Sequence, residues 1–297
     1  MLSILDYPNR GEGGENTYRG NCSPLLIEDL INHYQIRNLN DFMCGSGTTE
    51  DVCQKKRIET HCYDLNRGYD MLEMEIPVRS ENIFFHPPYW DIITYSDVMY
   101  PAEKGMKQFG FDPRKNDLSR CKEWKEFVKK MNYCMMKQFT SLENGGRMFV
   151  LMGDIKKKGQ LYSMLCEIIK PGSMEQILVK TQHNCMSYRK RYSGNFIPIV
   201  HEYLMIIRKD SSIIFPVGYF SNYKFDIRDS KSATWRDVIA SIMEEAGEVT
   251  LSYLYGQLEG HKKCENNQYW KEKIRQTLQK YKEFESVERG IWKLQVI

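Results

Sequence analysis

The segment DFMCGSGTT, residues 41–49, follows the apolar approach IRNLN and places Gly45, Ser46 and Gly47 before a helix that we expect near residues 48–54. Glycines let a backbone pass close to a ligand, and a helix start offers free amide donors to it. A tight strand-to-helix connection with no ligand would explain the glycines equally well. The segment predicts a strand, a turn and a helix, with a ligand site at the end of the strand.

A second strand end strengthens the ligand interpretation. HCYDLN, residues 61–66, predicts another strand that ends in Asp64. An acidic side chain at the tip of the next strand can accept hydrogen bonds from both hydroxyls of a ribose. The two strand ends together therefore predict a nucleotide-like pocket.

A third strand end is more specific. ENIFF is followed by HPPYW, residues 86–90, about forty residues after the glycine turn. Pro87 and Pro88 fix the backbone and remove two amide donors, which leaves carbonyl acceptors without internal partners. Tyr89 and Trp90 add aromatic faces suited to a planar ring that carries an exocyclic amino group. The alternative is a rigid proline turn that caps a core strand.

These segments resemble the S-adenosylmethionine-dependent DNA amino-methyltransferases. In that family motif I reads roughly DxFxGSGTT, and catalytic motif IV reads Asp, Asn or Ser followed by PPY or PPF. The resemblance covers about the first 210 residues of this chain. Three more segments match in order: RGNCSPLLIEDLINHY at 19–34 (motif X), LENGGRMFVLMGD at 142–154 and HEYLMIIRK at 201–209.

The resemblance implies an α/β, Rossmann-like methyltransferase domain that binds S-adenosyl-L-methionine. The implied catalytic residues are His86, Pro87, Pro88 and Tyr89. The implied cofactor-binding residues are Asn21, Ser23, Asp41, Phe42, Gly45, Ser46, Gly47, Thr48, Asp64, Asp70 and Met71. Ser23, with Pro24, also reads well as the start of a helix over residues 25–34.

His86 departs from the family pattern, which has an oxygen acceptor at this position. A neutral imidazole can also accept a hydrogen bond through one nitrogen, but a protonated one cannot. We therefore expect activity to fall as the pH drops through the titration of His86, and a flat profile from pH 5.5 to 8 would argue against His86 as the acceptor.

Basic and aromatic residues predict where nucleic acid binds. KTQHNCMSYRKRYSGNF, residues 180–196, has no acidic residue and mixes cations with tyrosines, which suits phosphates and stacked bases. An exposed basic hairpin is the alternative. The predicted DNA contacts are Trp90, Lys156, Tyr188, Arg189, Lys190, Arg191, Tyr192, Lys271 and Arg275.

Composition agrees with this reading without deciding it. The chain has 297 residues, 41% hydrophobic content and a net charge of +3, which is a weak indication of a nucleic-acid partner. It has no apolar run near twenty residues, and we expect a cytoplasmic protein with no membrane partner. None of the nine cysteines forms a CxxC pair, so we expect neither zinc nor disulfides.

Two further segments differ in residue pattern, and one predicts a loop and the other a helix. Residues 91–122 contain prolines and glycines with little helical period, which predicts a long ordered loop over the active site. The next segment predicts a helix whose apolar residues, at three- and four-residue steps, pack into the core. Those residues are Trp124, Phe127, Val128, Met131, Cys134 and Met135.

The chain changes character near Phe225, so we predict a catalytic domain at 1–224 and a small domain at 225–297. Helices are expected at 234–245, 253–259 and 266–281, before a hairpin that turns at Arg289 and Gly290. This order predicts a winged helix that binds DNA or docks a protein. On the last helix, Tyr269, Ile274 and Leu278 are expected inward, and Lys271, Arg275 and Gln279 outward.

The sequence thus predicts a site-specific methyltransferase that acts on the exocyclic amino group of a flipped base in double-stranded DNA. Adenine N6 is preferred over cytosine N4. An RNA or protein-glutamine methyltransferase, a non-catalytic DNA-binding regulator and a subunit of a restriction system remain alternatives. The target sequence and the oligomeric state are left open.

Overall fold

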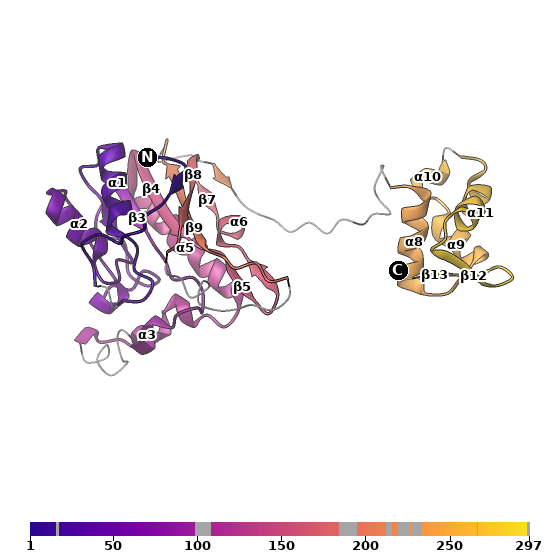
Figure 1. The fold of residues 1–297 in the computed structure, drawn as a ribbon, viewed down its shortest axis with the longest axis horizontal. Coiled ribbons are helices and arrows are strands. Elements are labelled where there is room, and N and C mark those ends of the chain that lie inside the picture. Colours follow the sequence, from indigo (N-terminus) through magenta and orange to yellow (C-terminus); the bar gives the residue numbers. More distant parts are fainter. Residues whose placement is uncertain are drawn as a thin grey trace. The chain divides into compact units, whose positions relative to one another are not determined.

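The computed structural model describes residues 1–15, 18–98, 108–183, 195–211, 216–218, 226, 233–265 and 267–295. The chain divides into two compact units, Met1–Phe220 and Ser221–Ile297 (Figure 1). The predicted boundary, between residues 224 and 225, falls four residues later, outside the described residues.

The first unit is built on one mixed sheet. Strand β9 (His201–Arg208) runs antiparallel to its neighbours β4 (Leu142–Met152) and β8 (Ser173–Thr181). The other adjacent pairs are parallel: β2 with β3, β3 with β4, and β1 with β8. The order across the sheet is β1 (Ile4–Leu5), β8, β9, β4, β3 (Ser80–Phe85) and β2 (Asn40–Asp41).

Helices cover both faces of this sheet (Figure 1). Each face of the sheet carries a cluster of buried apolar side chains. Helices α1 (Pro24–Tyr34) and α2 (Thr48–Lys56) contribute to one cluster, and α5 (Trp124–Ser141) contributes to the other. Alternate strand residues divide between the clusters, because successive side chains of a strand point to opposite faces. Phe84 and Phe149 join the α1 side, whereas Phe85 and Val150 join the α5 side. These three layers confirm the predicted α/β fold class.

Several local predictions agree with the structure. Helix α2 begins at Thr48, and α1 begins directly after Ser23 with Pro24 in its first turn. The predicted stripe on α5 is buried, except that Val128 is partly buried. The strand predicted for HCYDLN is reduced to one isolated parallel bridge, between Asp41 and Cys62, and a second bridge joins Asn38 to Glu59 just before this segment.

Shorter elements connect the main ones. They are 3₁₀ turns at Leu65–Arg67, Pro113–Lys115 and Leu118–Arg120; helices α3 (Tyr95–Val98) and α6 (Met164–Glu167); and strands β5 (Ile155–Lys157), β6 (Gln160–Tyr162), β7 (Lys170–Pro171) and β10 (Val217–Gly218). The predicted loop at 91–122 contains α3 and two of these turns; its residues 99–107 lie outside the described part. Among the helices that the structure describes, none is both long enough and apolar enough to cross a membrane.

The second unit has its own core and a three-stranded antiparallel sheet in the order β11, β13, β12. Its elements are α8 (Trp235–Ala246), β11 (Val249–Thr250), α9 (Leu251–Leu258), α10 (Lys262–Glu265), α11 (Trp270–Lys280), β12 (Phe284–Glu288) and β13 (Ile291–Leu294). Ile274 and Leu278 are buried as predicted. Tyr269 is 64% exposed, so its predicted inward position is wrong: it precedes the first turn of α11 and lies off the buried stripe.

Candidate functional site

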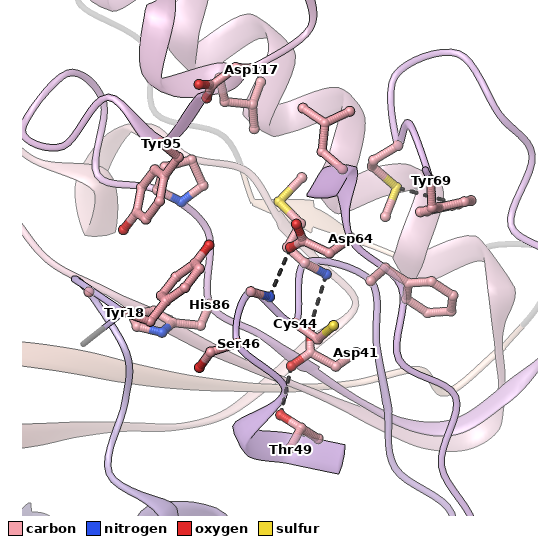
Figure 2. Close-up of a pocket in the computed structure, with 18 of the residues that line it drawn as sticks. Tyr18, Asp41, Cys44, Ser46, Thr49, Asp64, Tyr69, His86, Tyr95 and Asp117 are labelled. Carbon is pink, nitrogen blue, oxygen red and sulfur yellow. Dashed lines mark hydrogen bonds between the residues drawn. The ribbon is translucent and has the colours of Figure 1, made fainter. Parts of the chain in front are cut away.

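Asp41 holds the glycine turn together from below (Figure 2). One carboxylate oxygen accepts from the Met43 amide at 3.0 Å, and the other accepts from the Thr49 hydroxyl at 2.6 Å. Burial raises the pKa of Asp41 to about 7, although these two hydrogen bonds oppose the rise. Asp41 therefore supports the turn and the start of α2 through its hydrogen bonds.

Asp64 holds the same turn from the neighbouring strand end. It accepts from the Gly45 amide at 2.8 Å and from the Asn66 amide at 2.9 Å. Burial raises the pKa of this carboxyl, against the effect of the two amides. Gly45 has a φ of 50°, and a Cβ built there would meet the Tyr18 ring at 3.0 Å. A larger residue at position 45 would thus strain the backbone and crowd the space above the turn.

The turn forms the floor of a pocket of about 850 Å³, including its open mouth. Nine of the eleven predicted cofactor residues line it: Asn21, Asp41, Phe42, Gly45, Ser46, Thr48, Asp64, Asp70 and Met71. Ser23 does not, because its hydroxyl donates to the Arg10 carbonyl at 2.8 Å at the start of α1. Gly47 also falls outside the lining, as the left-handed residue (φ 88°) that precedes α2.

The chain segment before α1 reaches the same turn. The Thr48 hydroxyl donates to the Asn21 side chain, whose amide donates to the Glu15 carbonyl at 3.0 Å. This segment therefore contacts the start of α2, and of its two predicted cofactor residues Asn21 lies in the pocket wall and Ser23 does not.

The far wall of the pocket includes residues that the sequence did not single out. Asn116 donates to the Asp70 carboxylate at 2.7 Å, and Asp117 and Leu118 line the pocket beside it. These three lie in the loop predicted to cover the active site, so their position in that loop was the signal available. Tyr18 and Tyr95, also in the wall, stack at 5.9 Å between ring centroids (Figure 2).

His86 lies where this pocket meets a second one. The second pocket has a volume of about 1660 Å³, including open solvent, and shares Gly20, His86 and Tyr95 with the first. Its other lining residues are Pro87, Tyr89, Asp91, Ile92, Ile93, Gly153, Asp154, Ile155, Lys156, Lys157, Gln182, Phe196, Ile199, His201 and Glu202. Of the predicted catalytic residues, Pro88 lines only the first pocket, whereas Pro87 and Tyr89 line only the second.

Behind His86 lies a polar chain that runs from half-buried to buried residues. His86 Nε2 is 3.1 Å from the Tyr89 hydroxyl, which donates to Glu202 at 2.9 Å. Glu202 in turn accepts from the Lys180 ammonium at 2.8 Å. Burial lowers the pKa of His86 to about 4; the Glu202 carboxylate opposes this shift and Lys180 adds to it. His86 is therefore neutral at physiological pH, which corrects the expectation that it titrates between pH 5.5 and 8. A flat activity profile over that range is then compatible with His86 as the acceptor.

The prediction that Trp90 contacts DNA is wrong. Its side chain is 5% exposed and donates from Nε1 to the Cys121 carbonyl at 2.8 Å. The ring packs against Trp124 and Tyr162. Trp90 has a φ of 44°, so the backbone turns in the left-handed region where the chain leaves the proline motif, and the indole enters the core instead of the pocket.

The other predicted DNA contacts have different outcomes. Lys156 lines the second pocket, with its ammonium 4.7 Å from the centre of the Phe196 ring. Tyr188, Arg189, Lys190, Arg191 and Tyr192 lie outside the described residues. In the second unit, Lys271 and Arg275 are exposed on α11 as predicted, with Lys271 over the Trp270 ring and Arg275 paired with Glu272.

Comparisons with known proteins gave only distant structural likenesses. A protein from Thermus thermophilus assigned as a DNA modification methylase has 12% identity over 64% of this chain and 57% of its own, with a TM-score of 0.30. TrmN from Thermus thermophilus has 12% identity over 65% and 51%, with a TM-score of 0.32. A protein from Listeria monocytogenes assigned as a class I S-adenosylmethionine-dependent methyltransferase has 12% identity over 65% and 59%, with a TM-score of 0.31.

The match thus spans between about half and three fifths of the length of these three proteins. No family model matches the chain, and no curated protein matches it. Likenesses at this level carry no inference about function, which must come from the chain's own residues.

Proposed function

We propose that this protein transfers a methyl group from S-adenosyl-L-methionine to the exocyclic amino group of a base in double-stranded DNA, with adenine N6 as the preferred position. The observation that carries the proposal is the position of His86, which lines both pockets. A group-transfer enzyme needs its donor and its acceptor to meet at one wall, because positioning supplies much of the rate enhancement.

The first pocket suits S-adenosylmethionine. Each Asp64 oxygen accepts one backbone hydrogen bond, and a carboxylate has about four lone-pair sites, so Asp64 can also accept from ribose hydroxyls. An adenine ring would find an apolar surface among other lining residues of this pocket, namely Phe42, Met71, Leu72 and Leu118.

When bound, S-adenosylmethionine supplies a methyl group on a positively charged sulfur, which keeps the electron pair of the broken C–S bond. An exocyclic amine is a weak nucleophile because its lone pair is delocalised into the ring. The acceptors that would draw out its protons are His86 and the Pro87 carbonyl, both in the wall of the second pocket.

Nucleic acid as the substrate is supported by Lys156 in the wall of the second pocket and by the basic segment at 180–196, which begins at the end of β8. The wall also holds three carboxylates, Asp91, Asp154 and Glu202, and Lys157 pairs with Asp91. Cations of this kind bind phosphates, while a base lifted out of the duplex enters the pocket.

The second unit supports a DNA substrate separately. Its order of one helix, a short strand, further helices and a β-hairpin matches the winged-helix arrangement, with Lys271 and Arg275 on the exposed face of α11. We propose that this face binds DNA.

The proposal is tested by incubating the purified protein with S-adenosylmethionine and unmethylated duplex DNA, followed by mass spectrometry of the nucleosides. N6-methyladenine is expected, and it should be absent with His86→Ala. N4-methylcytosine instead would change the target base. Methylation of RNA alone, or cofactor binding with no methylated nucleoside, would overturn the DNA assignment.

A further inference from the structure

The polar chain behind His86 is assembled from three separate parts of the fold. His86 and Tyr89 follow β3, Lys180 lies on β8, and Glu202 lies on the adjacent strand β9. Lys180 and Glu202 are 8% and 7% exposed, respectively. A buried ion pair is costly unless its remaining hydrogen-bonding capacity is used, and here one Glu202 oxygen binds Lys180 while the other binds Tyr89.

The protonation states within the chain follow from its electrostatics. Burial alone would raise the pKa of Glu202, but the charge of Lys180 and the hydrogen bonds from Lys180 and Tyr89 outweigh it and lower the pKa. Burial, together with the Glu202 carboxylate, raises the pKa of Tyr89 well above its usual value. Glu202 is thus ionised and accepts hydrogen bonds only, whereas Tyr89 keeps its single proton.

The hydrogen bonds of Tyr89 determine which nitrogen of the His86 ring carries the proton. The Tyr89 hydroxyl uses its only proton in the 2.9 Å hydrogen bond to Glu202. Its oxygen can take part in the 3.1 Å contact with His86 only as an acceptor, so His86 Nε2 must be the donor. A neutral imidazole with its proton on Nε2 has a free lone pair on Nδ1.

We propose that Lys180, Glu202 and Tyr89 form a positioning chain that keeps His86 in its Nε2–H tautomer, so that Nδ1 is the acceptor for the target amino group. This inference rests on the proposed methyl transfer. The amino group donates to Nδ1, and its proton passes there as the nitrogen lone pair forms the bond to the methyl carbon. His86 then releases this proton to water, while Nε2–H stays bonded to Tyr89 throughout.

Besides stacking on a base, Tyr89 has a second role, which is to hold the His86 ring through its hydroxyl. Its ring packs against Gly153, where a Cβ would come within 2.7 Å of the ring, and its hydroxyl joins His86 to Glu202. Tyr89→Phe keeps the ring for stacking and removes only the hydroxyl. The variant therefore separates positioning from stacking.

Strand β9 offers a matched control. His201 Nε2 lies 2.9 Å from the Tyr203 hydroxyl, in a second histidine–tyrosine pair whose tyrosine lines neither pocket. Tyr203→Phe likewise removes a tyrosine hydroxyl next to a histidine, but His201 is not part of the chain formed by Lys180, Glu202 and Tyr89. It is expected to leave kcat within about twofold of the wild type.

The test combines long-range ¹H–¹⁵N spectra of histidine-labelled protein with steady-state kinetics on duplex DNA. His86 signals are assigned by their loss in His86→Gln. In the wild type we expect a neutral ring with a slowly exchanging proton on Nε2. In Tyr89→Phe we expect that proton to exchange rapidly and kcat to fall about tenfold, the size of one lost hydrogen bond of about 1.4 kcal/mol, with KM for DNA unchanged.

A second variant tests the buried charges. Lys180→Met combined with Glu202→Gln removes both at once, which avoids leaving an unpaired buried ammonium. In this double variant we expect the same faster exchange of the His86 Nε2 proton and the same fall in kcat as in Tyr89→Phe. An unchanged cofactor Kd would show that each variant is folded.

Two results would overturn the positioning chain: a wild-type His86 protonated on Nδ1, or a Tyr89→Phe variant with wild-type kcat and a slowly exchanging Nε2 proton. Failure of the proposed function looks different. The wild type would then produce no methylated nucleoside, while the spectra would still support the tautomer set by Tyr89.

Discussion

The two pockets that share His86 are built in different ways. The first is formed largely by short segments at the ends of neighbouring strands, where Asp41 and Asp64 bind backbone amides. The second draws part of its wall from β5, the start of β9 and residues 196–199, and its charged side chains are two lysines and three carboxylates. A site that binds one fixed molecule can use the backbone, whereas a site for a polymer needs charged side chains that meet phosphates.

The largest effect should come from His86, one of the three residues that line both pockets. His86→Ala is expected to lower kcat about 100-fold or more, because general acid–base groups contribute at least that factor. Cofactor affinity should change little, since Asp64 and the glycine turn remain. Methylation assays measure kcat, and calorimetric titration measures the cofactor Kd. Equal losses of kcat and of cofactor affinity would contradict a role for His86 in the wall that faces the acceptor.

A change in the first pocket alone should affect the cofactor alone. Asp64→Ala removes the proposed ribose acceptor and two hydrogen bonds to the backbone. Hydrogen bonds to charged groups contribute about 1.5–3 kcal/mol, so we expect the cofactor Kd to rise at least tenfold. Glu59→Gln, an exposed carboxylate on the same segment of chain, is the control. Unchanged cofactor binding in Asp64→Ala would remove Asp64 from the site.

A change in the second pocket alone should affect DNA alone. Lys156→Ala is expected to weaken DNA binding a few-fold and to lower the slope of log K against log salt by about one, as the loss of one phosphate contact requires. Lys55→Ala is the control, because Lys55 is exposed beside Glu12 and Glu28. A salt slope equal to that of the wild type would show that Lys156 does not meet a phosphate.

The smallest effect concerns pH. Because the pKa of His86 is lowered to about 4, its Nδ1 stays unprotonated and able to accept down to about pH 5. We expect kcat, measured at saturating cofactor and DNA, to be flat from pH 8 to 5.5 and to fall as the pH approaches 4. Asp41 has a pKa of about 7, and its titration can change cofactor binding. Measuring kcat at saturating cofactor removes that effect from the pH profile. The charged groups around His86 are Lys180, Glu202, Asp91, Asp154, Lys156 and Lys157.

A fall in kcat near pH 6.5 would show that His86 is solvated like a free histidine. Stability should follow the same group with a defined sign. The unfolded chain binds a proton at His86 near pH 6.5 and the folded chain only near pH 4, so this histidine destabilises the fold as the pH falls through that range.

The comparison also explains what could be predicted from the sequence. The glycine turn and Asp64 were predictable because each follows a strand signal within a few residues, whereas Asp70 came from the family resemblance. Glu202, Lys180 and Asn116 were not, because their partners lie 113, 22 and 46 residues away along the chain. Trp90 failed for a local reason: one left-handed residue after Tyr89 reverses the direction of its side chain.

The central claim is that His86 joins a cofactor pocket to a pocket for a base. The most direct test uses S-adenosylmethionine with a deuterated methyl group, duplex DNA, and nucleoside mass spectrometry of the wild type and His86→Ala. We predict labelled N6-methyladenine with the wild type and none above background with the variant, which should still bind the cofactor. Wild-type protein that binds the cofactor but leaves every nucleoside unlabelled would contradict the claim.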